Sequence, residues 1–199
     1  MQKEQIQKIP SRVMLLVLFF LTQAINSFSQ TDIEFWFVAP EITIGHGNFP
    51  GGEPVYFRVS ALELDATVRI FQPANPAGMD TTFNVPARTT FSLDASPWIN
   101  DLENRPGGII LNKGVQITST NLITVYYDED EYWNQDIFAL KGGNALGMEF
   151  YTPFQNVWDN PNWYTPLAYS SADIVATEDN TVITITPTAN LVGPYAAGV

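Results

Sequence analysis

The chain has 199 residues, of which 45% are hydrophobic and 13% aromatic, and it carries a formal net charge of −12 with no cysteine. This composition provides the material for a core and argues against intrinsic disorder, while the absence of cysteine excludes disulfides as a source of stability. The few basic residues are scattered singly, which disfavours binding to nucleic acid or to anionic membranes.

Residues 1–30 have the pattern of a secretory signal peptide. Lys3, Lys8 and Arg12 precede an uninterrupted apolar run at 13–21, and Ser27 and Ser29 are spaced like the small residues of a cleavage site. The apolar run is about half the length that a membrane-spanning helix needs. We therefore expect a secreted or cell-surface protein that does not insert into the membrane once this leader is cleaved.

Alternating apolar and polar residues predict β-strands along the rest of the chain, and helical periodicity is scarce. The strand segments are 55–59, 67–71, 89–93, 115–118, 123–127 and 181–185. They are rich in β-branched and aromatic residues and are bounded by Gly, Pro, Asn or Asp. Polar corners within 59–70, 117–127 and 175–185 predict three hairpins. The fold class is therefore all-β, an antiparallel β-sandwich-like unit, with a propeller-like or other closed β assembly as the alternative.

The chain also resembles itself at a nearly constant shift. Residues 33–35 match 148–150 at a shift of 115, and the conserved letters of DATVRIFQP at 65–73 recur in DNTVITITP at 179–187, at a shift of 114. Such a period fits a whole small domain better than a solenoid repeat. The sequence thus predicts a first all-β unit at 31–147 and the start of a second, incomplete unit at 148–199.

The densest acidic cluster, DEDEYWNQD at 128–136, is a candidate calcium site. Asp128, Asp130 and Asp136 provide the oxygen ligands that calcium prefers, although their order does not match an EF-hand loop. The alternative is a solvated loop whose like charges discourage edge-to-edge pairing of the sheet.

An aromatic-rich stretch at 151–169 contains the candidate ligand-binding residues Trp158, Trp163 and Tyr164. Exposed aromatic rings give rigid contact area at low entropic cost, as sugar-binding and protein-binding surfaces require. The alternative is that these rings cover the junction between the two predicted units.

Catalysis has little support in the sequence. His46 is the single histidine and lies in a Gly-rich loop, which gives little support to a zinc site or a Ser–His dyad. Carboxylate pairs for glycoside hydrolysis are available from Asp128, Asp130, Glu149 or Asp173, but nothing singles out one pair. We therefore predict no enzymatic activity, no catalytic residue and no cofactor other than calcium.

Three segments, LNKGVQITSTNLITVYY (111–127), DIFALKGGNALGMEFYTP (136–153) and ADIVATEDNTVITITP (172–187), resemble the IgGFc-binding protein N-terminal domain family. The resemblance runs from residue 33 to the end of the chain, in the order of the family. Bacterial members are exported, cysteine-poor and found near the front of long surface or secreted proteins, so the resemblance implies that this chain is truncated.

The family resemblance implies a non-catalytic recognition or adhesion module, the N-terminal part of a larger secreted or cell-surface protein. Its expected partner is an extracellular protein or glycan. Two other functions stay open from the residues alone. One is a carbohydrate-active enzyme fragment that uses paired carboxylates, and the other is a purely structural spacer.

Overall fold

The computed structural model describes residues 30–41, 54–130, 135–152 and 170–188, and all structural statements below concern these residues. In chain order its elements are β1 (Asp32–Phe37), β2 (Val55–Ala61), β3 (Ala66–Phe71), β4 (Asp80–Val85), β5 (Thr90–Asp94), the 3₁₀ turn η1 (Ser96–Trp98), the short helix α2 (Ile99–Leu102), β6 (Val115–Glu129), β7 (Asp136–Ala139) and the 3₁₀ turn η2 (Gly143–Ala145). The named strands pair antiparallel throughout. The all-β antiparallel prediction is confirmed.

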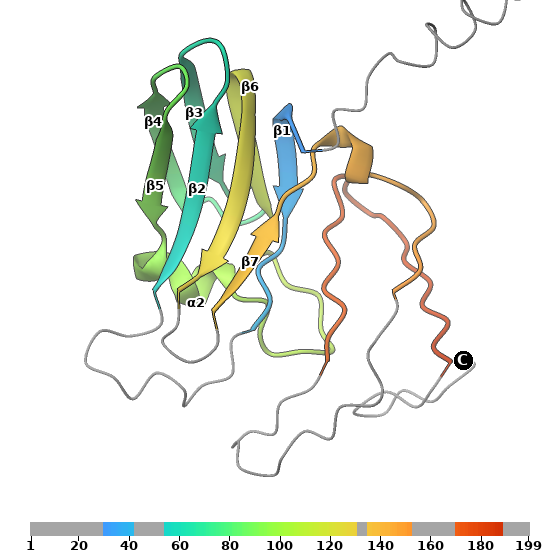
Figure 1. Cartoon of the computed structure of the whole chain (residues 1–199). Helices are drawn as coiled ribbons and strands as arrows, with labels where there is room; N and C mark the ends of the chain where they lie inside the picture. Colours follow the sequence, from blue (N-terminus) through green and yellow to red (C-terminus); the bar gives the residue numbers. More distant parts are fainter. Residues whose placement is uncertain (1–29, 42–53, 131–134, 153–169, 189–199) are drawn as a thin grey trace, which may run out of the picture.

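The long strand β6 organises the sheet, because it takes part in two layers. Its first half pairs with β1 and β3, and β4 adds to β3, which gives a first layer in the order β4-β3-β6-β1. Its second half pairs with β2 and β7, and β5 adds to β2, which gives a second layer in the order β5-β2-β6-β7. Figure 1 shows the two layers facing each other, with α2 at one end. A sheet that folds back on itself in this way fits a sandwich-like unit and also the closed-assembly alternative.

β6 bends where the sequence predicts a hairpin corner. Ser119 Oγ donates to the carbonyl of Asn121 at 2.7 Å and accepts from the amide of Asn121 at 3.4 Å. The two halves of β6 pair with other strands and not with each other, so the hairpin predicted over 117–127 is wrong and the two segments form one strand. The hairpin predicted over 59–70 is also wrong, because β2 and β3 pair with β6 rather than with each other.

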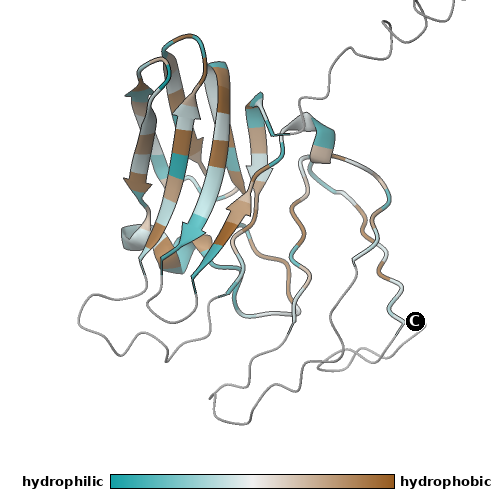
Figure 2. Cartoon of the chain, viewed as in Figure 1, coloured by the Kyte–Doolittle hydropathy of each residue, from teal (hydrophilic) through white to brown (hydrophobic). Residues whose placement is uncertain are grey.

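The core lies between the layers and follows from the alternation of the strands. In β2 every second residue from Val55 to Ala61 is buried, and Val68 and Ile70 of β3 are fully buried. Figure 2 shows the corresponding bands of apolar and polar residues along the strands. Rings join the layers, since Phe37 lies 6.2 Å from Phe57 in an edge-on arrangement. Burial of these side chains is the main favourable term for the fold.

Tyr127 is the largest fully buried side chain of this core. Its ring lies 4.8 Å from that of Phe37 and 5.2 Å from that of Phe57. Among the described residues its hydroxyl has no hydrogen-bond partner. Burial raises the pKa of Tyr127, and the nearby charges of Glu129 and Glu103 raise that pKa further.

Two polar side chains fasten the loops at the α2 end of the sandwich. Gln72, which is 2% exposed, donates to the carbonyls of Asp101 and Lys113 at 2.9 and 3.0 Å and accepts from the amide of Met79 at 3.1 Å. The ammonium of Lys113 donates to three backbone carbonyls, those of Asn100, Glu103 and Arg105. These bonds satisfy backbone carbonyls of the loops, which have no neighbouring strand to bond them.

The strand predicted at 181–185 is not formed, and residues 148–152 and 170–188 contain no helix or strand. Val182 is 89% exposed, whereas Val68, its counterpart in β3, is fully buried. The physical reason lies in the sheet: β1, β2 and β3 each depend on β6 as a partner. The described residues contain no second strand in the place of β6, so segments that resemble β1 and β3 have no ladder to join.

Candidate functional site

The outer face of the first layer carries a group of polar and aromatic side chains that we call the outer platform. It consists of Glu34 and Trp36 of β1, Arg69 and Phe71 of β3, Asp80 of β4 and Gln116 of β6. Successive residues of a strand point to opposite faces, so the buried Phe35, Ile70 and Ile117 send their neighbours outward. The same alternation that builds the core therefore builds the platform.

Strand register places the platform residues in two rows across the sheet. Asp80, Phe71, Gln116 and Trp36 are successive Cα partners in the first row. In the second row, Thr82, Arg69, Thr118 and Glu34 are successive partners. One strand, β6, separates the two rings of the first row, and two strand spacings amount to about 9.5 Å. The platform thus presents two rings with an amide between them.

Hydrogen bonds hold the β1 side of the platform in place. Glu34 Oε1 accepts from the indole N–H of Trp36 at 3.0 Å and from the side-chain amide of Gln116 at 2.7 Å. A single carboxylate oxygen therefore orients both the indole and the amide. Trp36 is partly buried, and this bond favours one orientation of its ring on the surface.

The β3 side is held by an ion pair and by stacking. Arg69 donates to both carboxylate oxygens of Asp80, with Nε to Oδ1 at 2.9 Å and Nη2 to Oδ2 at 2.7 Å. Its guanidinium carbon lies 4.0 Å from the centre of the Phe71 ring. The hydrogen bond from Arg69 lowers the pKa of Asp80, and the same bond raises the pKa of Arg69. These bonds use two of the five N–H donors that a guanidinium carries.

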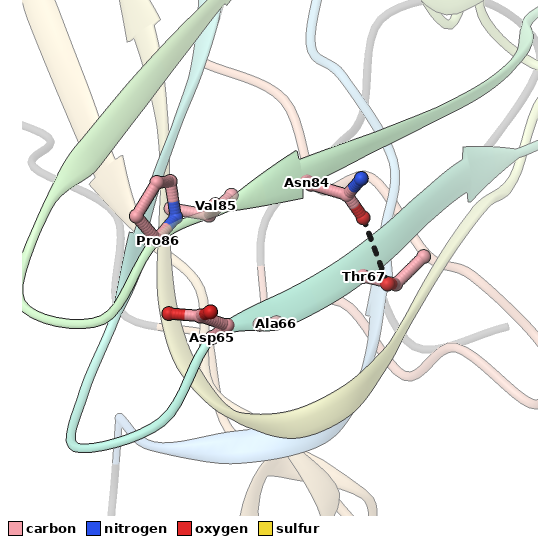
Figure 3. A pocket seen from close by; sticks show the side chains of 6 residues that line it. All are labelled: Asp65, Ala66, Thr67, Asn84, Val85 and Pro86. Carbon is pink, nitrogen blue, oxygen red and sulfur yellow. Dashed lines mark hydrogen bonds between the residues drawn. The ribbon is translucent and has the colours of Figure 1, made fainter.

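Shallow hollows lie at both ends of the β3–β4 pair. The first, with a volume of about 270 Å³, is lined by Asp65, Ala66, Thr67, Asn84, Val85 and Pro86. Figure 3 shows its polar groups, with the Thr67 hydroxyl donating to Asn84 Oδ1 at 2.8 Å. The second, of about 210 Å³, includes Arg69, Phe71 and Asp80 of the platform. The first layer therefore combines partly buried rings, charged groups and concave edges.

The predicted calcium ligands have separate protein partners. Asp128 forms an ion pair with Arg58, Asp130 accepts from Gln135 at 2.7 Å, and Asp136 accepts from the amide of Ile137 at 2.7 Å. Across 30–41, 54–130, 135–152 and 170–188, no three His, Asp or Glu side chains are grouped to hold a metal ion. Residues 131–134 of the acidic cluster lie outside the described residues, so calcium binding there stays a prediction.

The remaining residues that the sequence offers as site candidates either lie outside the described residues or have local partners. Trp158, Trp163 and Tyr164 lie outside the described residues, as does His46. Of the carboxylates considered for hydrolysis, Asp173 accepts from Asn104 Nδ2 at 2.6 Å, and Glu149 accepts from the Tyr151 hydroxyl at 2.9 Å. Each of these carboxylates has its own local partner, and none is joined to another by a described contact.

The outer platform was not found from the sequence. Its signal is present, because Trp36 alternates with Phe35 and Phe37, and Arg69 and Phe71 alternate with Val68 and Ile70. What the sequence does not give is the order β4-β3-β6-β1, which brings residues far apart in the chain into one row. The aromatic stretch at 151–169 is the denser local signal, so the sequence points to that stretch instead.

Fold and surface together define an all-β antiparallel protein with a polar and aromatic sheet face. In comparisons with known proteins, no family model and no curated protein matches this chain. Among solved structures, the crystal structure of Thermotoga maritima 1070 matches with a TM-score of 0.32 and 11% identity, over 59% of this chain and 95% of that one. In the part of the chain that the structure describes, no helix is both long and apolar enough to cross a membrane.

Proposed function

We propose that this chain is a non-catalytic recognition module of an exported protein, and that it binds an extracellular protein or glycan through the outer platform. The observation that supports this most strongly is the prearranged set of side chains on one sheet face. Glu34 orients Trp36 and Gln116, while Asp80 orients Arg69 above Phe71. Side chains already held in place lose little entropy when a ligand binds.

Export rests on the predicted leader at residues 1–30 and on the composition of the remaining chain. Without the leader, the chain has 6 basic and 20 acidic residues, a net charge of −14. Such a charge favours neutral or basic ligands over anionic ones. The secreted or cell-surface location and the adhesion role belong to this proposal, as does the resemblance to the IgGFc-binding protein N-terminal domain family.

The domain organisation belongs to the same proposal. The described sandwich, from β1 to η2, lies within the predicted first unit at 31–147. Residues 148–199 then belong to a second unit, in which 148–150 and 179–187 resemble 33–35 and 65–73 of the first. In this arrangement the first unit provides the binding surface, and the larger protein extends it from the cell.

Binding of the full chain to immobilised extracellular proteins and glycans tests the proposal. The double variant Trp36→Leu with Arg69→Leu removes two platform contacts, while Tyr56→Leu changes an aromatic residue on the outer face of the second layer. We expect a ligand that the native chain and Tyr56→Leu bind and that the platform variant binds at least tenfold more weakly. Equal binding by both variants would place the ligand elsewhere, and no binding at all would favour the spacer. Turnover of a bound glycan would favour the enzyme.

A further inference from the structure

We infer that the ligand of the outer platform is a neutral glycan chain of at least three sugar units, lying across β3, β6 and β1; this inference rests on the proposed function. Its basis is the chemical alternation of the first row. Trp36 provides an aromatic face, the guanidinium of Arg69 lies over the Phe71 ring and provides a second surface, and Gln116 and Asp80 provide hydrogen-bonding groups between and beside them. A sugar ring has the matching character, with an apolar C–H face and a rim of hydroxyl groups.

The spacing of the rings sets the size of the ligand. Phe71 and Trp36 are both Cα partners of Gln116, on opposite sides of β6. Two strand spacings of about 9.5 Å are close to twice the length of one sugar unit, so they suit a chain that contacts the Phe71 side with one unit and Trp36 with the next unit but one. Gln116 then faces the unit between them.

The polar groups suit hydroxyl ligands. A carboxylate accepts hydrogen bonds only, and a side-chain amide and a guanidinium add donors, so the platform can bond both sides of a sugar hydroxyl. Glu34 Oε1 already receives two bonds, from Trp36 and Gln116, and Asp80 receives two from Arg69. This network fixes the direction of the remaining lone pairs and N–H groups, which is how polar groups give specificity in binding sites.

The composition of the platform favours a glycan over a protein. The core of a protein–protein interface is apolar and depleted of Asp and Glu. Here two of the six platform residues are carboxylates, Glu34 and Asp80. The two carboxylates and the acidic chain oppose an anionic polysaccharide, which leaves neutral glycans as the class that fits.

The test is affinity electrophoresis of the full chain in gels that contain laminarin, mannan or xyloglucan as neutral glycans, or alginate as an anionic one. We expect at least one neutral glycan to retard the native chain and alginate not to do so. The variants Trp36→Leu and Phe71→Leu remove one ring each and should weaken that retardation about tenfold, since one lost contact of moderate strength corresponds to this factor. Tyr56→Leu, on the other layer, should retain it.

Glu34→Gln provides a second, nearly isosteric variant in case loss of a ring disturbs the fold, and far-ultraviolet circular dichroism checks each protein. It should weaken retardation without changing the spectrum. Retardation by neutral glycans that the three platform variants do not alter overturns the inference. Platform-dependent binding to an immobilised protein, with no glycan bound, also overturns it while leaving the proposed function intact. Binding to neither kind of ligand overturns both.

Discussion

The guanidinium carbon of Arg69 lies 4.0 Å from the centre of the Phe71 ring, two residues further along β3. Both side chains leave the same face of the strand, because Ile70 between them points into the core. Asp80 of the neighbouring strand holds the guanidinium in this position through two hydrogen bonds. A short piece of sequence, TVRIF, therefore serves the core with one set of residues and the outer platform with the other.

The Arg69–Asp80 pair predicts an unusual titration. Because the bond from Arg69 lowers the pKa of folded Asp80, this carboxyl should stay charged below the usual aspartate value of about 3.9. The pair stabilises the fold above the unfolded pKa, and this contribution disappears as the pH falls through the lower folded pKa. The Asp80 and Arg69 side chains are 50% and 47% exposed, so solvent screens the pair and its contribution to stability is small. We therefore expect that breaking the pair produces no measurable change in the thermal midpoint.

Carbon-detected NMR of the Asp80 carboxyl measures this pKa. Arg69→Leu should return it to the ordinary range. Arg88→Leu, which breaks an exposed ion pair with Glu63 instead, should leave it unchanged. An ordinary pKa for Asp80 in the native protein would show that the two side chains are not paired in solution.

The buried hydroxyl of Tyr127 can be removed, we expect, without loss of stability. Its hydroxyl is buried without a hydrogen-bond partner among the described residues, so Tyr127→Phe removes an unsatisfied polar group and should leave the free energy of unfolding unchanged or slightly higher. Tyr127→Ala leaves a cavity between Phe37 and Phe57 and should cost about 3–5 kcal/mol.

Urea unfolding measures both Tyr127 variants. The native protein should also show one tyrosine that does not ionise in an ultraviolet titration until the fold is lost, because burial raises the pKa of this group. A clear loss of stability in Tyr127→Phe would mean that the hydroxyl has a hydrogen-bond partner.

For Gln72, in contrast to the hydroxyl of Tyr127, we expect that removing the polar group destabilises the fold. Replacing it by leucine preserves much of its volume but leaves the amide of Met79 and the carbonyls of Asp101 and Lys113 without their bonds. We expect a loss of about 3 kcal/mol in the free energy of unfolding, because buried unsatisfied groups keep their full desolvation cost. Gln135→Leu, at an exposed position, is the matched control and should change little. Equal stability of the two variants would show that Gln72 does not fasten these loops.

The described part of the acidic cluster predicts little response to calcium. Asp128 is paired with Arg58, and Asp130 and Asp136 have partners of their own, so the described carboxylates are not gathered for a cation. Taken alone, these described carboxylates predict the same thermal midpoint of the full chain in millimolar calcium and in chelator. A higher midpoint in calcium, lost in Asp130→Asn, would establish the site that the sequence predicts, since a ligand of the folded state stabilises it.

Much of the fold is readable from the sequence where strands alternate cleanly. The segments around Phe57, Ile70 and Val125 were predicted as strands, because their buried residues recur with period two. β4 is not predicted because only Phe83 and Val85 of DTTFNV are apolar, and β7 is not predicted because it has only four residues. Local patterns are weakest in such short or polar edge strands.

Pairing was harder to predict than strand position. Ser119 and Asn121 form the same local bonds in a bent strand that they would form in a hairpin corner, so the continuity of β6 does not show in the sequence. The segment TVITITP has the alternation of a strand, but a strand also needs a neighbour. Predicting the outer platform from the sequence requires the same knowledge of strand pairing, because strand order decides which outward-facing residues lie next to each other.

The indole N–H signals of the five tryptophans give the most direct measurement of the central claim. Titrating the full ¹⁵N-labelled chain with whichever of laminarin, mannan or xyloglucan retards it should shift the signal of Trp36, whose N–H bonds to Glu34, and leave that of Trp98 near α2 in place. A shift confined to Trp158 or Trp163, with Trp36 unchanged, would contradict the account and return the binding site to the aromatic stretch at 151–169.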